Sequence, residues 1–125
     1  MCNAVKNVTG SVRNAMRGLA YAYRHDKSIR LEVCFGVPAF GVVAYLLAPL
    51  SGTEVMFLAV AAGFIFITEL LNTSIEALLD KLHPEQHEMI RISKDIASAA
   101  VLAAFAAAGV IVAALFLADA GSIPF

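Results

Sequence analysis

Three long apolar stretches, separated by short polar segments, dominate the chain. Residues 33–50 carry no charged side chain, residues 55–80 become polar only in their second half, and residues 95–118 have no charge after Asp95. At ~1.5 Å per residue, helices of these lengths cross or nearly cross the ~30 Å hydrocarbon core of a bilayer. The pattern therefore predicts three transmembrane helices.

The segment before the first apolar stretch has apolar side chains on a single helical stripe. They are spaced by three and four residues, and Lys6, Arg13 and Arg17 lie largely off the stripe: Val5, Val8, Val12, Met16, Leu19 and Tyr23. This pattern is typical of an amphipathic helix lying in a membrane surface. We assign residues 1–30 to this surface helix and a linker. A helix covering a water-soluble core is the alternative, and the apolar stretches that follow disfavour it.

Composition agrees with a membrane protein of one domain, residues 1–125. Of 125 residues, 60% are hydrophobic and 15% are charged, whereas globular domains have roughly 45–50% and about 25%. The net charge of −1 gives no reason to expect nucleic acid. Cys2 and Cys34 lie in different settings, so we expect neither a disulfide nor a cysteine metal site.

Prolines and polar residues mark the breaks. Residues 49–54, Pro-Leu-Ser-Gly-Thr-Glu, predict a tight turn, and Pro38 is expected to kink the first span. His83 and His87 are four residues apart, but Pro84 between them disturbs a shared helical face. We therefore favour a solvated loop over a histidine metal site.

All nine Lys and Arg residues lie before the first span or between the second and third spans. The turn at 51–54 and the tail at 119–125 carry none. Because cytoplasmic segments are enriched in basic residues, we expect the N-terminus and the 80–95 loop to be cytoplasmic and the C-terminus to be outside.

Polar residues begin inside the second apolar stretch and follow one helical face: Glu69, Asn72, Thr73, Glu76 and Asp80. Their spacing of three and four residues places them on a common stripe. An ionisable side chain at membrane depth costs at least a few kcal/mol unless it is paired or hydrated, so it marks a candidate functional site. Asp80 alone is also explained as the point where the helix leaves the membrane.

Carboxylates and a lysine at a cytoplasmic membrane surface suit chemistry on a phosphorylated molecule. Acids bind divalent cations, and Lys94 offers a point charge to a phosphoryl oxygen. Glu69, at greater depth, is suited to accept a proton from a lipid hydroxyl. The sequence has no G-x-x-x-x-G-K-[ST] phosphate loop. From the residues alone, a small proton or cation transporter using Glu69 and a purely structural protein remain alternatives.

Two segments carry a family resemblance. Residues 69–80 read Glu-Leu-Leu-Asn-Thr-Ser-Ile-Glu-Ala-Leu-Leu-Asp, which resembles E-x-x-N-[ST]-[SA]-[LIV]-E-x-x-x-D, the signature of the prokaryotic diacylglycerol kinase family. Residues 94–101, Lys-Asp-Ile-Ala-Ser-Ala-Ala-Val, are similar to its second block, K-D-x-x-[SA]-[AG]-A-V. The resemblance implies a homotrimeric kinase of the bacterial inner membrane, with sites at subunit interfaces, that uses Mg²⁺ and ATP and phosphorylates a lipid hydroxyl by direct in-line transfer.

The resemblance also implies roles for single positions. Glu69 resembles the general base for the lipid hydroxyl, and Asn72 a residue that organises it. The other positions resemble contacts to metal, nucleotide or lipid: Glu76 and Asp26 for the metal, Glu76, Lys94, Asp80 and Asp95 for ATP, and Ser98, Glu32 and Arg30 for the lipid substrate.

The chain departs from the family pattern in two places. Asp26 stands where the family usually has the longer glutamate. The family's N-terminal phosphate-binding arginine aligns with Lys6-Asn7-Val8, so we expect Arg17, or alternatively Arg13, to take its role. Arg30-Leu31-Glu32 and residues 85–88 are closer to the diacylglycerol kinase branch than to the N-F-R-I-H pattern of undecaprenol kinases. Diacylglycerol is therefore the expected substrate, and undecaprenol is the alternative.

Overall fold

The regular elements in the described part of the chain are all helical. The computed structural model describes residues 2–82 and 87–121, with side chains from residue 9 onward. Its elements in chain order are α1 (Cys2–His25), α2 (Lys27–Leu31), the π-helical turn η1 (Glu32–Gly36), α3 (Val37–Leu46), α4 (Gly52–Leu82) and α5 (Glu88–Asp119). The prediction of an all-α protein is confirmed.

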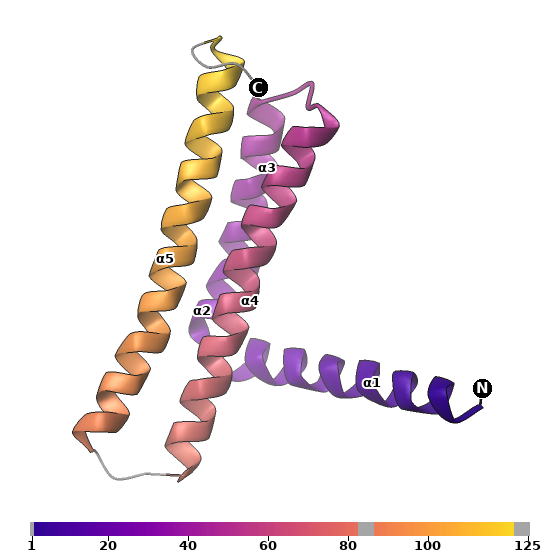
Figure 1. Cartoon of the computed structure of the whole chain (residues 1–125), viewed down its shortest axis with the longest axis vertical. Helices are drawn as coiled ribbons and strands as arrows, with labels where there is room; N and C mark the ends of the chain where they lie inside the picture. The colour runs from indigo at the N-terminus through magenta and orange to yellow at the C-terminus, as the bar shows by residue number, and fades with distance from the viewer. Residues whose placement is uncertain (1, 83–86, 122–125) are drawn as a thin grey trace.

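Among the described residues, three helical segments are long and apolar enough to cross a membrane: Lys27–Leu46, Gly52–Leu82 and Glu88–Asp119. The helices α3, α4 and α5 run side by side, and α1 projects sideways from the bundle at the point where α2 begins (Figure 1). This arrangement confirms the prediction of one separate N-terminal helix followed by three membrane-length helices.

The first membrane helix begins earlier and ends earlier than the predicted 33–50. It begins at Lys27 because the Asp26 side chain accepts hydrogen bonds from the first backbone N–H groups of α2, which a helix start otherwise leaves unsatisfied. It ends at Leu46, where Pro49 disfavours helical backbone at the residue before it.

The longer helices α4 and α5 also extend beyond the predicted 55–80 and 95–118, because their first turns are capped. At the start of α4, Ser51 Oγ accepts from Glu54 N at 3.3 Å, and Glu54 Oε2 accepts from Ser51 N at 2.6 Å. This reciprocal pair is a capping box. At the start of α5, His87 Nδ1 accepts from Met89 N at 3.2 Å. His83, the other histidine of the predicted solvated loop, lies outside the described residues.

The irregularity expected at Pro38 takes the form of the π-helical turn. Val37 N–H donates to Glu32 O, five residues back, so the helix is locally wider just before the proline. Proline has no N–H, and its ring crowds the carbonyl four residues earlier in a regular helix. A π-turn relieves this conflict without ending the helix.

Small residues bring α4 and α5 together. Ala61 and Ile65 of α4 pack against Ala104 and Ala108 of α5, and such small side chains allow close backbone approach in membranes. The small residues in the first two thirds of α5 are divided by this contact. Ala97, Ala104 and Ala108 are buried, whereas Ser98, Ala100, Ala103 and Ala107 are exposed.

Replacing Ala104 by leucine is expected to destabilise the protein by about 1–3 kcal/mol, because Ala104 is 0% exposed between α4 and α5 and has no room for a larger side chain. Thermal unfolding in detergent micelles measures the effect. Ala106→Leu is the matched control, since Ala106 is exposed on the same helix between Leu102 and Val110, which are 72% and 70% exposed. Equal stability of the two variants would contradict the assigned packing.

Candidate active site

A polar hollow of about 190 Å³ lies where the α1–α2 corner meets α4 and α5. It is lined by Asp26, Ser28, Glu69, Asn72, Glu76, Ser98 and Val101. Its three carboxylates come from two parts of the chain that are far apart in sequence. The hollow thus gathers all four residues predicted for proton transfer and metal binding, together with Ser98 from the predicted lipid contacts.

The α4 wall of this hollow is a fixed acid–amide group. Glu69 is 6% exposed and Asn72 is 8% exposed. Asn72 Nδ2 donates to Glu76 Oε1 at 3.0 Å, one turn further along the helix. Within the described part of the chain, Asn72 Oδ1 is buried and accepts no hydrogen bond. Because buried polar atoms are normally paired, this oxygen is a candidate acceptor for a bound ligand.

The corner wall is built on Asp26, the single residue between α1 and α2. Its backbone is extended, and its Oδ1 accepts from Ser28 N at 2.7 Å and Ile29 N at 3.4 Å. Thr73 Oγ1, on α4, donates to Asp26 Oδ2 at 2.6 Å. One carboxylate therefore caps α2 and ties the corner to the helix that carries Glu69.

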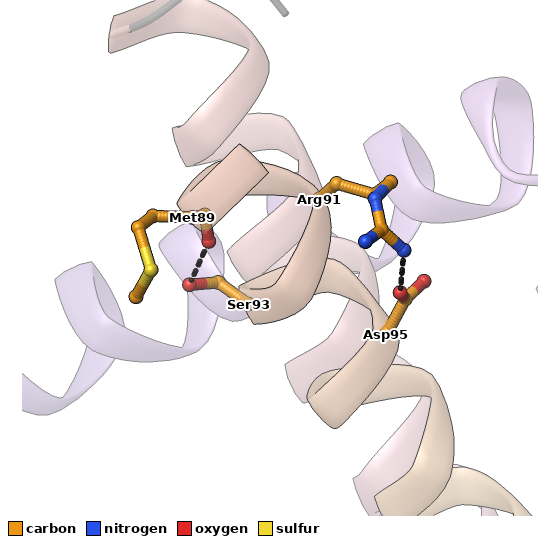
Figure 2. A network of polar contacts seen from close by, with 4 residues as sticks. All are labelled: Met89, Arg91, Ser93 and Asp95. Carbon is orange, nitrogen blue, oxygen red and sulfur yellow. Dashed lines mark hydrogen bonds and ion pairs between the residues drawn. The ribbon is translucent and has the colours of Figure 1, made fainter. Parts of the chain in front are cut away.

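Towards the loop between α4 and α5, three of the predicted nucleotide residues, Asp80, Lys94 and Asp95, take part in ion pairs. Lys94 Nζ lies 2.5 Å from Asp80 Oδ1, bridging α5 and α4. Asp95 instead pairs with Arg91 on the exposed face of α5 at 2.9 Å, and the Ser93–Met89 hydrogen bond lies on another side of the same helix (Figure 2). Exposed ion pairs contribute only about 0–1 kcal/mol, so a charged ligand can displace either pair at little cost.

The remaining predicted residues do not line the polar hollow. Arg30 Nη1 donates to Arg24 O at 2.8 Å and to Tyr23 O at 3.5 Å, so its guanidinium caps the last carbonyls of α1. Arg17 is exposed on α1. Glu32 borders a second hollow, about 410 Å³ and mostly apolar, whose lining includes Phe40, Phe66 and Phe105.

Thr73 and Ser28 take part in the site although the sequence suggested no role for either. Thr73 stood on the predicted stripe, but its partner Asp26 is 47 positions away, a separation that helical periodicity does not address. Ser28 had a local signal. An aspartate, Asp26, lies two residues before it and is a common residue type at a helix start. The assignment of residues 1–30 to a surface helix and a linker does not anticipate a helix that begins at Lys27.

A family model described as prokaryotic diacylglycerol kinase matches residues 13–116, which include all of α2, η1, α3 and α4 and most of α5. The match covers both walls of the polar hollow. The chain belongs to the prokaryotic diacylglycerol kinase family. The resemblance read from the two sequence blocks is thereby confirmed.

Several members of this family are similar to the chain over most of its length. A diacylglycerol kinase of Synechocystis is 34% identical over 89% of this chain and 63% of its own length. Those of Pseudomonas aeruginosa and Escherichia coli K12 are 31% and 33% identical, over 77% and 78% of this chain and 76% and 84% of their own lengths. The chain thus spans less than two thirds of the Synechocystis relative but most of the other two.

The hydrogen bonds of Arg30 are expected to stabilise the last turn of α1. Arg30→Leu is expected to raise amide hydrogen exchange roughly tenfold in the last turn of α1, because a charged donor to its terminal carbonyls is lost. Mass spectrometry of the deuterated protein in micelles reads the change. Arg13 is exposed in the middle of α1, so Arg13→Leu should leave hydrogen exchange in the last turn unchanged. Unchanged exchange in Arg30→Leu would rule out the capping role.

Proposed function

We propose that this protein transfers the γ-phosphoryl group of ATP to the hydroxyl of a membrane lipid, converting diacylglycerol to phosphatidic acid. The observation that carries the proposal is the convergence of Asp26, Glu69, Asn72 and Glu76 on one hollow between helices of membrane length. Membership in a family of diacylglycerol kinases supports the same chemistry.

In the proposed reaction, Glu69 is the general base. As the lipid oxygen forms its bond to the γ-phosphorus, the Glu69 carboxylate accepts the hydroxyl proton, the bond from the γ-phosphorus to its bridging oxygen breaks, and ADP leaves. The depth of Glu69 in the second span and its low exposure support this role, since a lipid hydroxyl approaches from the membrane side. Asn72 holds Glu76 and orients the site beside the base.

Glu76 and Asp26 are the proposed protein ligands of Mg²⁺. Within the described residues, no group of three or more His, Cys, Asp or Glu side chains is placed to hold a metal ion by itself. This fits the ion, because Mg²⁺ retains several waters and takes one or two protein carboxylates together with substrate phosphates. When bound, Mg²⁺ would neutralise charge on the phosphates.

Around this centre, the other family positions have proposed contacts to ATP and lipid. Lys94 would exchange part of its pairing with Asp80 for a phosphate oxygen, with Asp80 and Asp95 near the adenosine and Arg17 near the phosphates. On the lipid side, Ser98 lines the polar hollow and Glu32 borders the apolar one. Arg30 would contact the lipid from its position at the end of α1.

The proposed setting is the bacterial inner membrane, with the N-terminus cytoplasmic and the C-terminus outside. The placement of all nine basic residues at the cytoplasmic ends of the spans supports this orientation. We further propose a homotrimer, as the family resemblance implies. Large exposed apolar side chains on α3, α4 and α5 are compatible with contact to lipid and to neighbouring copies.

Undecaprenol is the alternative acceptor within the same proposal. The relatives with the highest coverage are named diacylglycerol kinases, which favours diacylglycerol. The two lipids share the hydroxyl on which Glu69 would act, so they are distinguished by the product and not by the site.

Glu69→Gln is expected to lower lipid phosphorylation roughly 10²- to 10⁴-fold, because the amide cannot accept the hydroxyl proton. The measurement is phosphate transfer from ATP in micelles containing diacylglycerol and undecaprenol together, with the products separated. Phosphatidic acid should dominate with the wild type. Glu54→Gln, at the opposite end of α4, is the matched control and should keep its activity.

Two outcomes would count against the proposal. Full activity in Glu69→Gln would remove the general-base assignment. An oligomeric, folded wild type that phosphorylates neither lipid would overturn the kinase proposal, and ion flux through liposomes that depends on Glu69 but not on ATP would then favour the transporter.

Glu76→Gln is expected to weaken nucleotide binding in the presence of Mg²⁺ by roughly tenfold or more, since a charged ligand becomes neutral. Binding of a fluorescent ATP analogue, with and without Mg²⁺, measures it. The loss should be confined to the Mg²⁺ condition. A loss of the same size without the metal would contradict the assignment of Glu76 as a metal ligand.

A further inference from the structure

The carboxylate of Asp26 has both oxygens engaged by the protein. Oδ1 accepts from the backbone N–H groups of Ser28 and Ile29 and so caps α2. Oδ2 accepts from the Thr73 hydroxyl at 2.6 Å. Each oxygen has more than one lone-pair direction, so the carboxylate retains acceptor capacity towards the hollow that it lines. Its orientation is therefore set before any ligand arrives.

Thr73 has two acceptors within reach and only one proton. Its Oγ1 lies 2.6 Å from Asp26 Oδ2 and 2.9 Å from Glu69 O, the backbone carbonyl one turn earlier. A hydrogen bond to an ionised carboxylate is shorter and stronger than one to a neutral carbonyl. The proton is thus directed to Asp26. Thr73 itself is 8% exposed, so water does not readily replace it.

The location of Thr73 on α4 relates Asp26 to the other acids. Thr73 follows Asn72 directly and lies between Glu69 and Glu76 on the same helix. Asp26, at the corner of α1 and α2, and Thr73 on α4 are 47 positions apart in the sequence. The hydroxyl is consequently a direct polar link that sets where Asp26 stands relative to Glu76.

We propose that Thr73 is a positioning residue, whose hydroxyl holds Asp26 Oδ2 so that Asp26 and Glu76 present a prearranged pair of ligands to the metal–nucleotide complex. The inference rests on the proposed kinase function and adds a residue to its metal site. Partners that orient a metal ligand typically affect metal affinity 10- to 100-fold when they are lost.

The test compares Thr73→Val, which keeps the shape but removes the proton, with Thr73→Ser, which keeps the hydroxyl. Thr68→Val is the matched control. Thr68 lies on the same helix and donates only to its own helix, to Phe64 O and Ile65 O. The probe is Mn²⁺ titrated with a non-hydrolysable ATP analogue into the full-length protein in micelles, followed by electron paramagnetic resonance.

Thr73→Val should bind Mn²⁺ roughly 10- to 100-fold more weakly, whereas Thr73→Ser and Thr68→Val should match the wild type. Wild-type Mn²⁺ affinity in a folded Thr73→Val would overturn the proposal. So would a loss that Thr73→Ser does not rescue, since the methyl group and not the hydroxyl would then be responsible.

A second measurement separates positioning from general damage to the fold. If Thr73 acts through Asp26, Thr73→Val should cause no further loss of Mn²⁺ affinity in an Asp26→Ala background. Additive losses would overturn the proposal. Lipid phosphorylation by the wild type in the same micelles distinguishes failure of this inference from failure of the proposed function. If the wild type is active and Thr73→Val keeps the wild-type Mn²⁺ affinity, this inference alone is wrong. If the wild type is inactive, the proposed function is wrong as well.

Discussion

The constraint on which this structure depends is the cost of a carboxylate at membrane depth. Glu69 lies within a helix that is otherwise apolar enough to span a bilayer, and hydrocarbon offers an ionisable group no hydrogen bonds. The fold meets this constraint by enclosing Glu69 between α4, α5 and the α1–α2 corner. Small side chains at Ala61, Ala104 and Ala108 hold the two long helices close at a level nearer the start of α4, and the polar hollow opens beyond that contact.

The corner between α1 and α2 belongs to the site as much as the long helices do. A single residue, Asp26, interrupts the helix, and the turn is held on both sides: Arg30 caps the end of α1, and Asp26 caps the start of α2. Ile29 is fully buried beside it. The projecting helix α1 in Figure 1 is therefore joined to the bundle through Asp26, whose carboxylate also lines the hollow.

Much of this organisation was predictable from local patterns. The spans follow from apolar length, and the Glu69–Asn72–Glu76 stripe follows from spacing, which α4 reproduces. Apolar length does not predict the helix starts that capping decides, as at Asp26 and Ser51, because the capping residues and the first helical turn are themselves polar. The Arg91–Asp95 pair is an i,i+4 spacing and was available in principle. The Asp80–Lys94 and Asp26–Thr73 contacts were not, since both require knowledge of how separate helices pack.

The exposure of the acidic side chains on α4 increases along the helix and agrees with the roles proposed for them. Glu69 is buried, Glu76 is half-buried and Asp80 is exposed, so the stripe leads from a position enclosed by protein to one that is open. Among the residues that the structure describes, the hollow's lining contains three acids and no basic residue, while Lys94 and Arg91 are paired with Asp80 and Asp95. Such a negative site repels ATP phosphates unless a cation accompanies them. The charge balance therefore favours the less buried acids, Asp26 and Glu76, as metal ligands and the buried Glu69 as the base for the lipid hydroxyl.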